Sequence, residues 1–369
     1  MKSGVSSWRT RLLPPLLAIV FALLLSAIAL IISGADPLQA YGTMVGQLFK
    51  GSTAVDTVNL GCVYYLSGLA VAIGFQMNLF NIGVEGQYRF AAVVAAIIGG
   101  ALQLPPVLHT IVILLVAIVS GALYATIPAV LKVTRGVSEV ISTIMLNSIV
   151  AGIIAFLVNA DQFGVQTGNN VGTRQIAPSG RIPGIPIGSG TLFGFVFIAI
   201  VIGAAYWFML NRTRFGFELK ASGESSTAAS AGGVSAKKMT LIAMLLSGAV
   251  AGLVAMPELL GRDYSYGITA TQMYGFTGIA VALLGRNHPG GIAFGALLWA
   301  FLDTSAVSLE QINVSKEIAT IMQGIIVLSV VVAYEIVRRA DLAAEQRRVG
   351  RALAGNGRKG SSVAEGGAV

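Results

Sequence analysis

Residues 107–131 read VLHTIVILLVAIVSGALYATIPAVL, and this stretch decides the fold class. It contains no Asp, Glu, Lys or Arg. A helix needs roughly 20 apolar residues to cross the hydrocarbon core of a bilayer. Inside lipid no water bonds to the peptide groups, so a spanning segment must satisfy them internally, as a helix does. The stretch therefore predicts a transmembrane helix.

Comparable apolar runs recur along the whole chain. Hydrophobic types make up 55% of the 369 residues and charged types 11%, whereas soluble domains average roughly 25% charged residues. We therefore predict an all-α integral membrane protein with about ten transmembrane helices. The ten predicted segments are 12–32, 58–79, 88–104, 107–131, 140–158, 191–210, 240–256, 272–284, 291–308 and 316–337.

The basic residues predict how these segments are oriented. When the N-terminus is placed in the cytoplasm and the segments alternate, 19 of the 24 Lys and Arg residues fall on the cytoplasmic side and 5 on the outer side. Basic residues concentrate in cytoplasmic loops, so we expect both termini in the cytoplasm. We expect a transmembrane permease domain over 1–340 and a cytoplasmic tail over 341–369, whose Gly, Ser, Ala and Arg content predicts disorder.

Two long loops and an internal symmetry follow from the same alternation. The outer loop 159–190 is expected to form an external cap or docking surface, and the inner loop 211–239 to contain a short helix. Four-segment blocks near 58–158 and 240–337 have opposite orientation, which predicts inverted repeats. Each block has a polar stretch interrupted by glycine, which we call a glycine break: residues 81–87 in the first block and 261–275 in the second. Such breaks in inverted repeats indicate a transport path.

Two glycine pairs at helical spacing predict close contact between helices. They are Gly248 with Gly252, and Gly291 with Gly295. Glycine lets helix backbones approach closely because it has no side chain. We interpret both pairs as packing features and not as parts of a binding site.

The inventory of reactive side chains argues against an enzyme. The two histidines, His109 and His288, are predicted near opposite faces of the membrane and cannot share a metal or a catalytic triad. The chain has one cysteine, Cys62, and no Cys or His pair at metal-ligand spacing. It also has no P-loop motif. We expect no catalytic residue, no metal and no cofactor in this chain, and any ATP hydrolysis must come from a separate subunit.

Polar residues beside the glycine breaks are candidates for a translocation path. A carboxylate at membrane depth, as predicted for Glu85, is costly and usually functional. The alternatives are a helix-end ion pair between Glu85 and Arg89 at the inner surface, or a structural role in packing the loop. Asn147 lies inside a predicted span, where an amide bonds to a neighbouring helix or faces a cavity. The candidate path residues are Asn81, Glu85, Gln87, Asn147, Gln272 and Phe276.

Four stretches resemble the permeases of bacterial ATP-binding-cassette importers for simple sugars, nucleosides and branched-chain amino acids. The last of them is most similar to the nucleoside branch of that family. Together they cover most of the chain in the expected order. The stretches are FNIGVEGQ at 80–87, EVISTIMLN at 139–147, GFELKASGE at 216–224 and YGFTGIAVALLGRNHP at 274–289.

The resemblance implies a type II importer architecture of ten helices in the bacterial plasma (inner) membrane. It implies a cytoplasmic ATPase that uses ATP, a second permease chain that is commonly different, and an extracellular solute-binding lipoprotein. Residues 216–232 resemble the segment that docks in a cleft of the ATPase, although Ser222, Ser225 and Ser226 stand where Val, Asn and Pro are common. The implied ATPase-coupling residues are Glu218, Gly223, Ala228, Ala229 and Gly232.

The resemblance to the nucleoside branch implies a nucleoside or a related small polar solute. Aromatic residues near the second glycine break, including Tyr264, Tyr266, Tyr274 and Phe276, suit a solute with an aromatic base, although they are equally typical of membrane interfaces. Import of a simple sugar such as ribose or of branched-chain amino acids remains an alternative within the family. An ion-coupled secondary transporter is the alternative from another class, and it predicts more ionisable residues in the spans than this chain has.

Overall fold

The computed structural model describes residues 20–167, 170–267, 273–315 and 317–330, with positions 332, 333, 336 and 339. The chain divides into two compact units, Leu38–Lys316 and a smaller unit made of Met1–Pro37 and Glu317–Val369. The described part of the smaller unit contains the helices Val20–Ile32 and Glu317–Val330. The predicted disordered tail, 341–369, lies outside the described residues.

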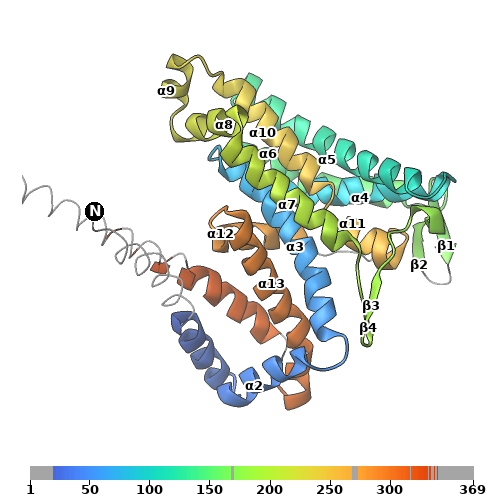
Figure 1. Cartoon of the computed structure of the whole chain (residues 1–369), viewed down its shortest axis with the longest axis vertical. Helices are drawn as coiled ribbons and strands as arrows, with labels where there is room; N and C mark the ends of the chain where they lie inside the picture. The colour runs from blue at the N-terminus through green and yellow to red at the C-terminus, as the bar shows by residue number, and fades with distance from the viewer. Residues whose placement is uncertain are drawn as a thin grey trace, which may run out of the picture. The chain divides into compact units, whose positions relative to one another are not determined.

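The larger unit is built almost entirely from helices, as predicted for an all-α protein (Figure 1). Its α-helices are α2 (Pro37–Leu48), α3 (Thr53–Phe75), α4 (Val84–Ala101), α5 (Leu108–Arg135), α6 (Glu139–Leu157), α7 (Phe195–Arg212), α8 (Arg214–Glu224), α9 (Ser226–Ala231), α10 (Ala236–Ala251), α11 (Met256–Glu258), α12 (Tyr274–Leu284) and α13 (Pro289–Ala306). Shorter helical turns are η1 (Pro178–Gly180), the π-helical η2 (Leu259–Asp263) and η3 (Val307–Ile312).

Fewer helices than predicted are long and apolar enough to cross a membrane. Within the described residues there are six, or seven if Val20–Ile32 and Pro37–Leu48 form one span. The predicted count of about ten is therefore not confirmed. One predicted span is the 11-residue helix α12, whose length of roughly 16 Å is about half the hydrocarbon thickness. The six are Thr53–Phe75, Leu108–Arg135, Glu139–Leu157, Phe195–Arg212, Ala236–Asp263 and Pro289–Ile312.

Helix α3 lies at the centre of the larger unit. It packs against α7, α10, α12 and α13, and 78% of its most hydrophobic stretch of 18 residues is buried. In α5 and α6 the buried share falls to 33% and 22%. The outer faces of these two helices expose large apolar side chains such as Leu123, Ile141 and Phe156. Apolar side chains on the outer faces, around a packed interior, are typical of a membrane protein.

Small residues bring α5 and α10 into backbone contact. A Cβ atom added at Gly252 would lie 2.1 Å from the Ala117 carbonyl oxygen, and one at Gly121 would lie 2.2 Å from the Gly248 carbonyl oxygen. A Cβ at Gly291 would likewise lie 2.4 Å from the carbonyl oxygen of Gly285. The predicted packing role of these glycines is therefore confirmed.

The predicted outer cap contains two β-hairpins. Strand β1 (Gly164–Thr167) pairs with β2 (Asn170–Thr173), and β3 (Ile185–Ile187) pairs with β4 (Gly190–Leu192). These strands were not predicted from the sequence. Figure 1 shows the hairpins at one end of the larger unit and α8 with α9 at the other end.

Backbone hydrogen bonds attach the hairpin region to the segment that follows η2. The Thr173 N–H donates to the Tyr266 carbonyl oxygen at 2.9 Å, and the Ile176 N–H donates to the Tyr264 carbonyl oxygen at 2.7 Å. The guanidinium group of Arg181 lies 4.0 Å from the centre of the Tyr264 ring. The outer cap is thus bound to the second predicted glycine break.

Candidate translocation site

Helix α4 begins inside the larger unit and is capped by another helix. Its own N-cap residue, Gly83, has no side chain to bond the first free N–H groups. Asn147 of α6 replaces that cap, because its Oδ1 accepts a hydrogen bond from the Gly86 N–H at 2.9 Å. The Nδ2 of the same amide donates to the Ile82 carbonyl oxygen at 3.0 Å. Backbone groups at a helix start must find hydrogen-bond partners when water is absent. The Asn147 side chain is the partner of two such groups, the Gly86 N–H and the Ile82 carbonyl oxygen.

Helix α12 also begins inside the unit, and Glu85 of α4 caps it. The residue before it, Met273, makes no side-chain cap. Glu85 Oε2 accepts a hydrogen bond from the Gly275 N–H at 2.9 Å. A negative group is favourable at a helix N-terminus. Gly275 permits the approach, because a Cβ there would lie 2.3 Å from the Glu85 nitrogen.

These two capped helix starts lie well inside the spans. Asn147 is the ninth of the 19 residues of α6. The Cβ position of Gly86 is 3.4 Å from the Tyr124 ring, and Tyr124 is the seventeenth of the 28 residues of α5. Glu85 therefore lies between the ends of both spans. It also forms the ion pair with Arg89, at 4.0 Å, in the first turn of α4.

A pocket of about 310 Å³ opens beside these caps. Three predicted path residues, Glu85, Asn147 and Phe276, line it together. Phe276 is 40% exposed, so its ring is available to a ligand. The remaining lining residues are Arg89, Ile144, Ser148 and Met273. The pocket combines a few polar groups with apolar side chains, as small-molecule sites do.

Two other predicted path residues form a buried amide pair away from this pocket. Asn81 Nδ2 donates to Gln87 Oε1 and Gln87 Nε2 donates to Asn81 Oδ1, each at 3.0 Å. Asn81 also donates to Ser247 Oγ of α10 at 2.8 Å, and that hydroxyl donates to the Ala70 carbonyl oxygen of α3 at 2.6 Å. Both amides are 1% exposed. Their contacts fasten the loop between α3 and α4 to the helix core.

Three tyrosines next to the pocket each donate a hydroxyl hydrogen bond to a different carboxylate. Tyr88 donates to Glu85 at 3.2 Å and Tyr274 to Glu258 at 2.6 Å. The third bond, from Tyr64 to Asp303, is also 2.6 Å long. The Tyr274 ring lies 5.7 Å from that of Tyr88 and 5.8 Å from that of Tyr64.

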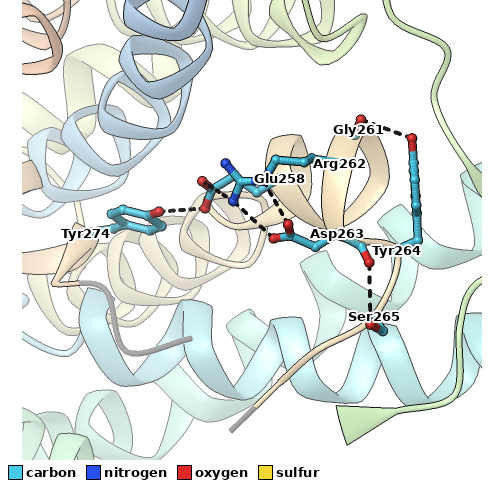
Figure 2. A network of polar contacts seen from close by, with 7 residues as sticks. All are labelled: Glu258, Gly261, Arg262, Asp263, Tyr264, Ser265 and Tyr274. Atoms are coloured by element: carbon cyan, nitrogen blue, oxygen red, sulfur yellow. Dashed lines mark hydrogen bonds and ion pairs between the residues drawn. The ribbon is translucent and has the colours of Figure 1, made fainter. Parts of the chain in front are cut away.

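Figure 2 shows how this cluster continues to the end of the span that starts with α10. Arg262 Nη2 donates to Glu258 Oε1 at 2.9 Å, and Arg262 Nε donates to Asp263 Oδ1 at 2.8 Å. Glu258 thus bonds to both Arg262 and Tyr274, which lie near the two ends of the second glycine break. A π-helical turn such as η2 is frequent at functional sites.

A family profile described as branched-chain amino acid transport system / permease component matches residues 53–331. The match covers the two capped helix starts and the pocket between them. The chain belongs to this permease family. The importer permease resemblance of the four sequence stretches is therefore confirmed, and so is the prediction that the chain is a transport subunit and not an enzyme.

Curated relatives of the permease extend over nearly its full length. The guanosine ABC transporter permease protein NupP of Bacillus subtilis is 34% identical over 334 residues, which cover 89% of this chain and 95% of the relative. The nucleoside ABC transporter permease protein NupB of Lactococcus lactis is 32% identical, with 88% and 92% covered. The glucose ABC transporter permease protein TsgB13 of Haloferax volcanii is 30% identical, with 85% of each covered. No solved structure shows significant similarity to this chain.

The predicted ATPase-coupling residues of the permease lie on two consecutive short helices. Glu218, in α8, pairs with Arg214 at 2.8 Å. Gly223 contacts the loop after α3, because Asn78 Nδ2 donates to its carbonyl oxygen at 2.7 Å and a Cβ there would lie 2.1 Å from the Gln76 carbonyl oxygen. In α9 and its cap, Ala228 and Gly232 are exposed and Ala229 is buried.

The pocket contains residues that were not predicted from the sequence. They are Arg89, predicted only as the ion-pair partner of Glu85, and Ser148. The signals were present in the sequence, since Arg89 follows Glu85 by one helical turn and Ser148 is adjacent to Asn147. The predicted path residue Gln272 lies outside the described residues.

Proposed function

We propose that this permease is the membrane-spanning subunit of an ATP-driven importer that carries nucleosides into the cytoplasm. The pocket lined by Glu85, Arg89, Asn147, Ser148 and Phe276 carries the proposal. The opposite charges of Glu85 and Arg89 offset each other, which suits a neutral solute. An exposed aromatic ring beside polar groups suits an aromatic base joined to a sugar. The guanosine and nucleoside permeases among the relatives support this solute class.

The remaining components of the importer follow from what this chain lacks and from its family. With no P-loop motif in the sequence, the ATP is used by a cytoplasmic ATPase that docks on α8 and α9, and this chain holds no cofactor. A second permease chain, different from this one, lines the other side of the path. An extracellular solute-binding lipoprotein docks on the hairpins of β1 to β4.

The proposed orientation is the one the basic residues predict, with both termini in the cytoplasm of a bacterium and the chain in its plasma membrane. The proposed inverted repeats pair α3, α4 and α5 with α10, α12 and α13. In this assignment α3 corresponds to α10 and α5 corresponds to α13, so a contact of α5 with α10 should be matched by a contact of α13 with α3. Packing supports the assignment, because both contacts are present. The two capped helix starts, of α4 and α12, occupy corresponding places in the repeats.

Uptake of labelled solutes tests the solute class. Cells that carry the complete transporter are compared with cells from which only this chain is deleted, using guanosine, uridine, ribose, glucose and leucine. We expect the deletion to abolish uptake of nucleosides and to leave the others unchanged. Loss of glucose or ribose uptake with intact nucleoside uptake would assign a sugar instead, an alternative that the similarity to a glucose permease supports.

A further inference from the structure

Hydrogen-bonding capacity in the pocket is concentrated on Arg89. The oxygens of Glu85 already accept from Tyr88 and from the start of α12, and both ends of the Asn147 amide bond to backbone groups. In contrast, Arg89 Nε is buried without a hydrogen-bond partner among the described residues. Its side chain is 17% exposed and lines the pocket. Because Nε itself is buried, the donors that a solute in the pocket can reach are those of the rest of the guanidinium group.

A guanidinium group restricts what that ligand can be. Arginine carries only donors, arranged in a rigid planar fork that matches two adjacent acceptors. Glu85, whose oxygen lies 4.0 Å from the guanidinium group, offsets the positive charge, so the ligand need not be an anion. The Phe276 ring, 40% exposed in the same pocket, suits stacking with a flat ring. The pocket therefore suits a neutral aromatic ring with two neighbouring acceptors on one edge.

We propose that Arg89 selects 6-oxopurine nucleosides, such as guanosine and inosine, by donating to O6 and N7 of a base stacked on Phe276. This proposal rests on the proposed nucleoside import. Arginine pairs with O6 and N7 of guanine, whereas adenine presents an amino donor in place of O6. Ser148, whose hydroxyl has no partner among the described residues, supplies a further polar contact in the pocket.

The base preference of the complete transporter tests this assignment. Uptake of guanosine and of adenosine is measured in the same cells, and their ratio in each variant is divided by the wild-type ratio. The binding protein is the same in all arms, so its contribution cancels. Glutamine pairs with N6 and N7 of adenine, so we expect Arg89→Gln to lower the ratio by about tenfold and to shift preference toward adenosine. Arg135→Gln, at the exposed end of α5, is the matched control and should leave the ratio unchanged.

Several outcomes overturn the assignment. An unchanged ratio in Arg89→Gln, or an equal loss of uptake for both nucleosides, would mean that Arg89 does not read the base. If the glutamine variant is missing from the membrane, Arg89→Lys decides, because it keeps the charge and loses the fork. We then expect a severalfold smaller preference for guanosine without inversion, and an unchanged preference overturns the idea. If deletion of the whole chain leaves the uptake of both nucleosides intact, the proposed function fails instead.

Discussion

Glu85 caps a helix to which it does not belong. A carboxylate inside a span is costly unless its charge is compensated. Here three compensating groups surround it: the Gly275 N–H at the start of α12, the hydroxyl of Tyr88 and the guanidinium group of Arg89. Of the three interpretations open from the sequence, the contacts favour a structural role for Glu85, which at the same time holds Arg89 at the pocket.

The capping role predicts a specific order of stability. Glu85→Ala removes the charged hydrogen bonds made by the buried Gly275 N–H and by the Tyr88 hydroxyl, so we expect it to lower the free energy of unfolding by about 2 kcal/mol. Glu85→Gln keeps an acceptor oxygen and should cost roughly half as much. Both are measured by denaturant unfolding of the purified permease in micelles. Glu224→Ala, at an exposed position of α8, is the control, and an equal effect of Glu85→Ala and the control would refute the cap.

Among the elements, α5 and α10 approach each other closely along their backbones. Their contact depends on glycine at positions 121, 248 and 252, where an added Cβ would meet backbone atoms rather than flexible side chains. Close approach of this kind stabilises helix pairs in membranes by van der Waals contact. The α5–α10 contact supports the α4 start, because α5 also carries Tyr124, which lies beside Gly86.

A pair of glycine substitutions with opposite expected signs tests this packing. Gly252→Ala would place a Cβ 2.1 Å from the Ala117 carbonyl oxygen, and overpacking of this kind costs about 1–3 kcal/mol. Gly152→Ala, on α6, meets no atom within 4 Å and should be neutral or stabilising by up to about 1 kcal/mol, because alanine favours the helix. Thermal unfolding in micelles measures both. Equal effects of the two substitutions would contradict the packing argument.

At the scale of the larger unit, a chain of contacts connects the predicted ATPase surface to the pocket. Gly223 of α8 contacts Gln76 and Asn78 in the loop after α3. The same loop contains Asn81, bonded to Gln87 of α4, and α4 carries Glu85 and Arg89. We expect a displacement of α8 to reach the helix that lines the pocket through this loop.

A charge exchange on α8 separates docking from local stability. Glu218→Arg faces Arg214 with a like charge, and we expect it to abolish ATP-driven uptake while the permease remains in the membrane. The double variant Arg214→Glu with Glu218→Arg restores the pair within α8, whose contribution at this exposed site is only about 0.5 kcal/mol. If docking requires Glu218, the double variant stays inactive and co-purifies with less ATPase. Recovery of uptake would show that Glu218 matters only within α8.

The sequence by itself determined the class of protein, the positions of most helices and the family. Long uncharged runs such as 107–131 leave a helix in lipid as the one available structure, because peptide groups there have no water to bond. The sequence also indicated that Glu85 and Asn147 lie at a polar site among the spans, because carboxylates and amides are rare inside membrane helices.

Only the tertiary structure decided which polar groups meet. The bond from the Gly275 N–H to Glu85 joins residues 190 positions apart, and that from the Gly86 N–H to Asn147 joins residues 61 apart. No local pattern specifies such pairs, because they depend on how α4, α6 and α12 pack. Because of the same packing, Asn81 and Gln87 bond to each other away from the pocket, whereas Arg89 lines it. Helices form here because lipid leaves the backbone no alternative, whereas the pocket forms because close-packed glycines let two helix starts meet.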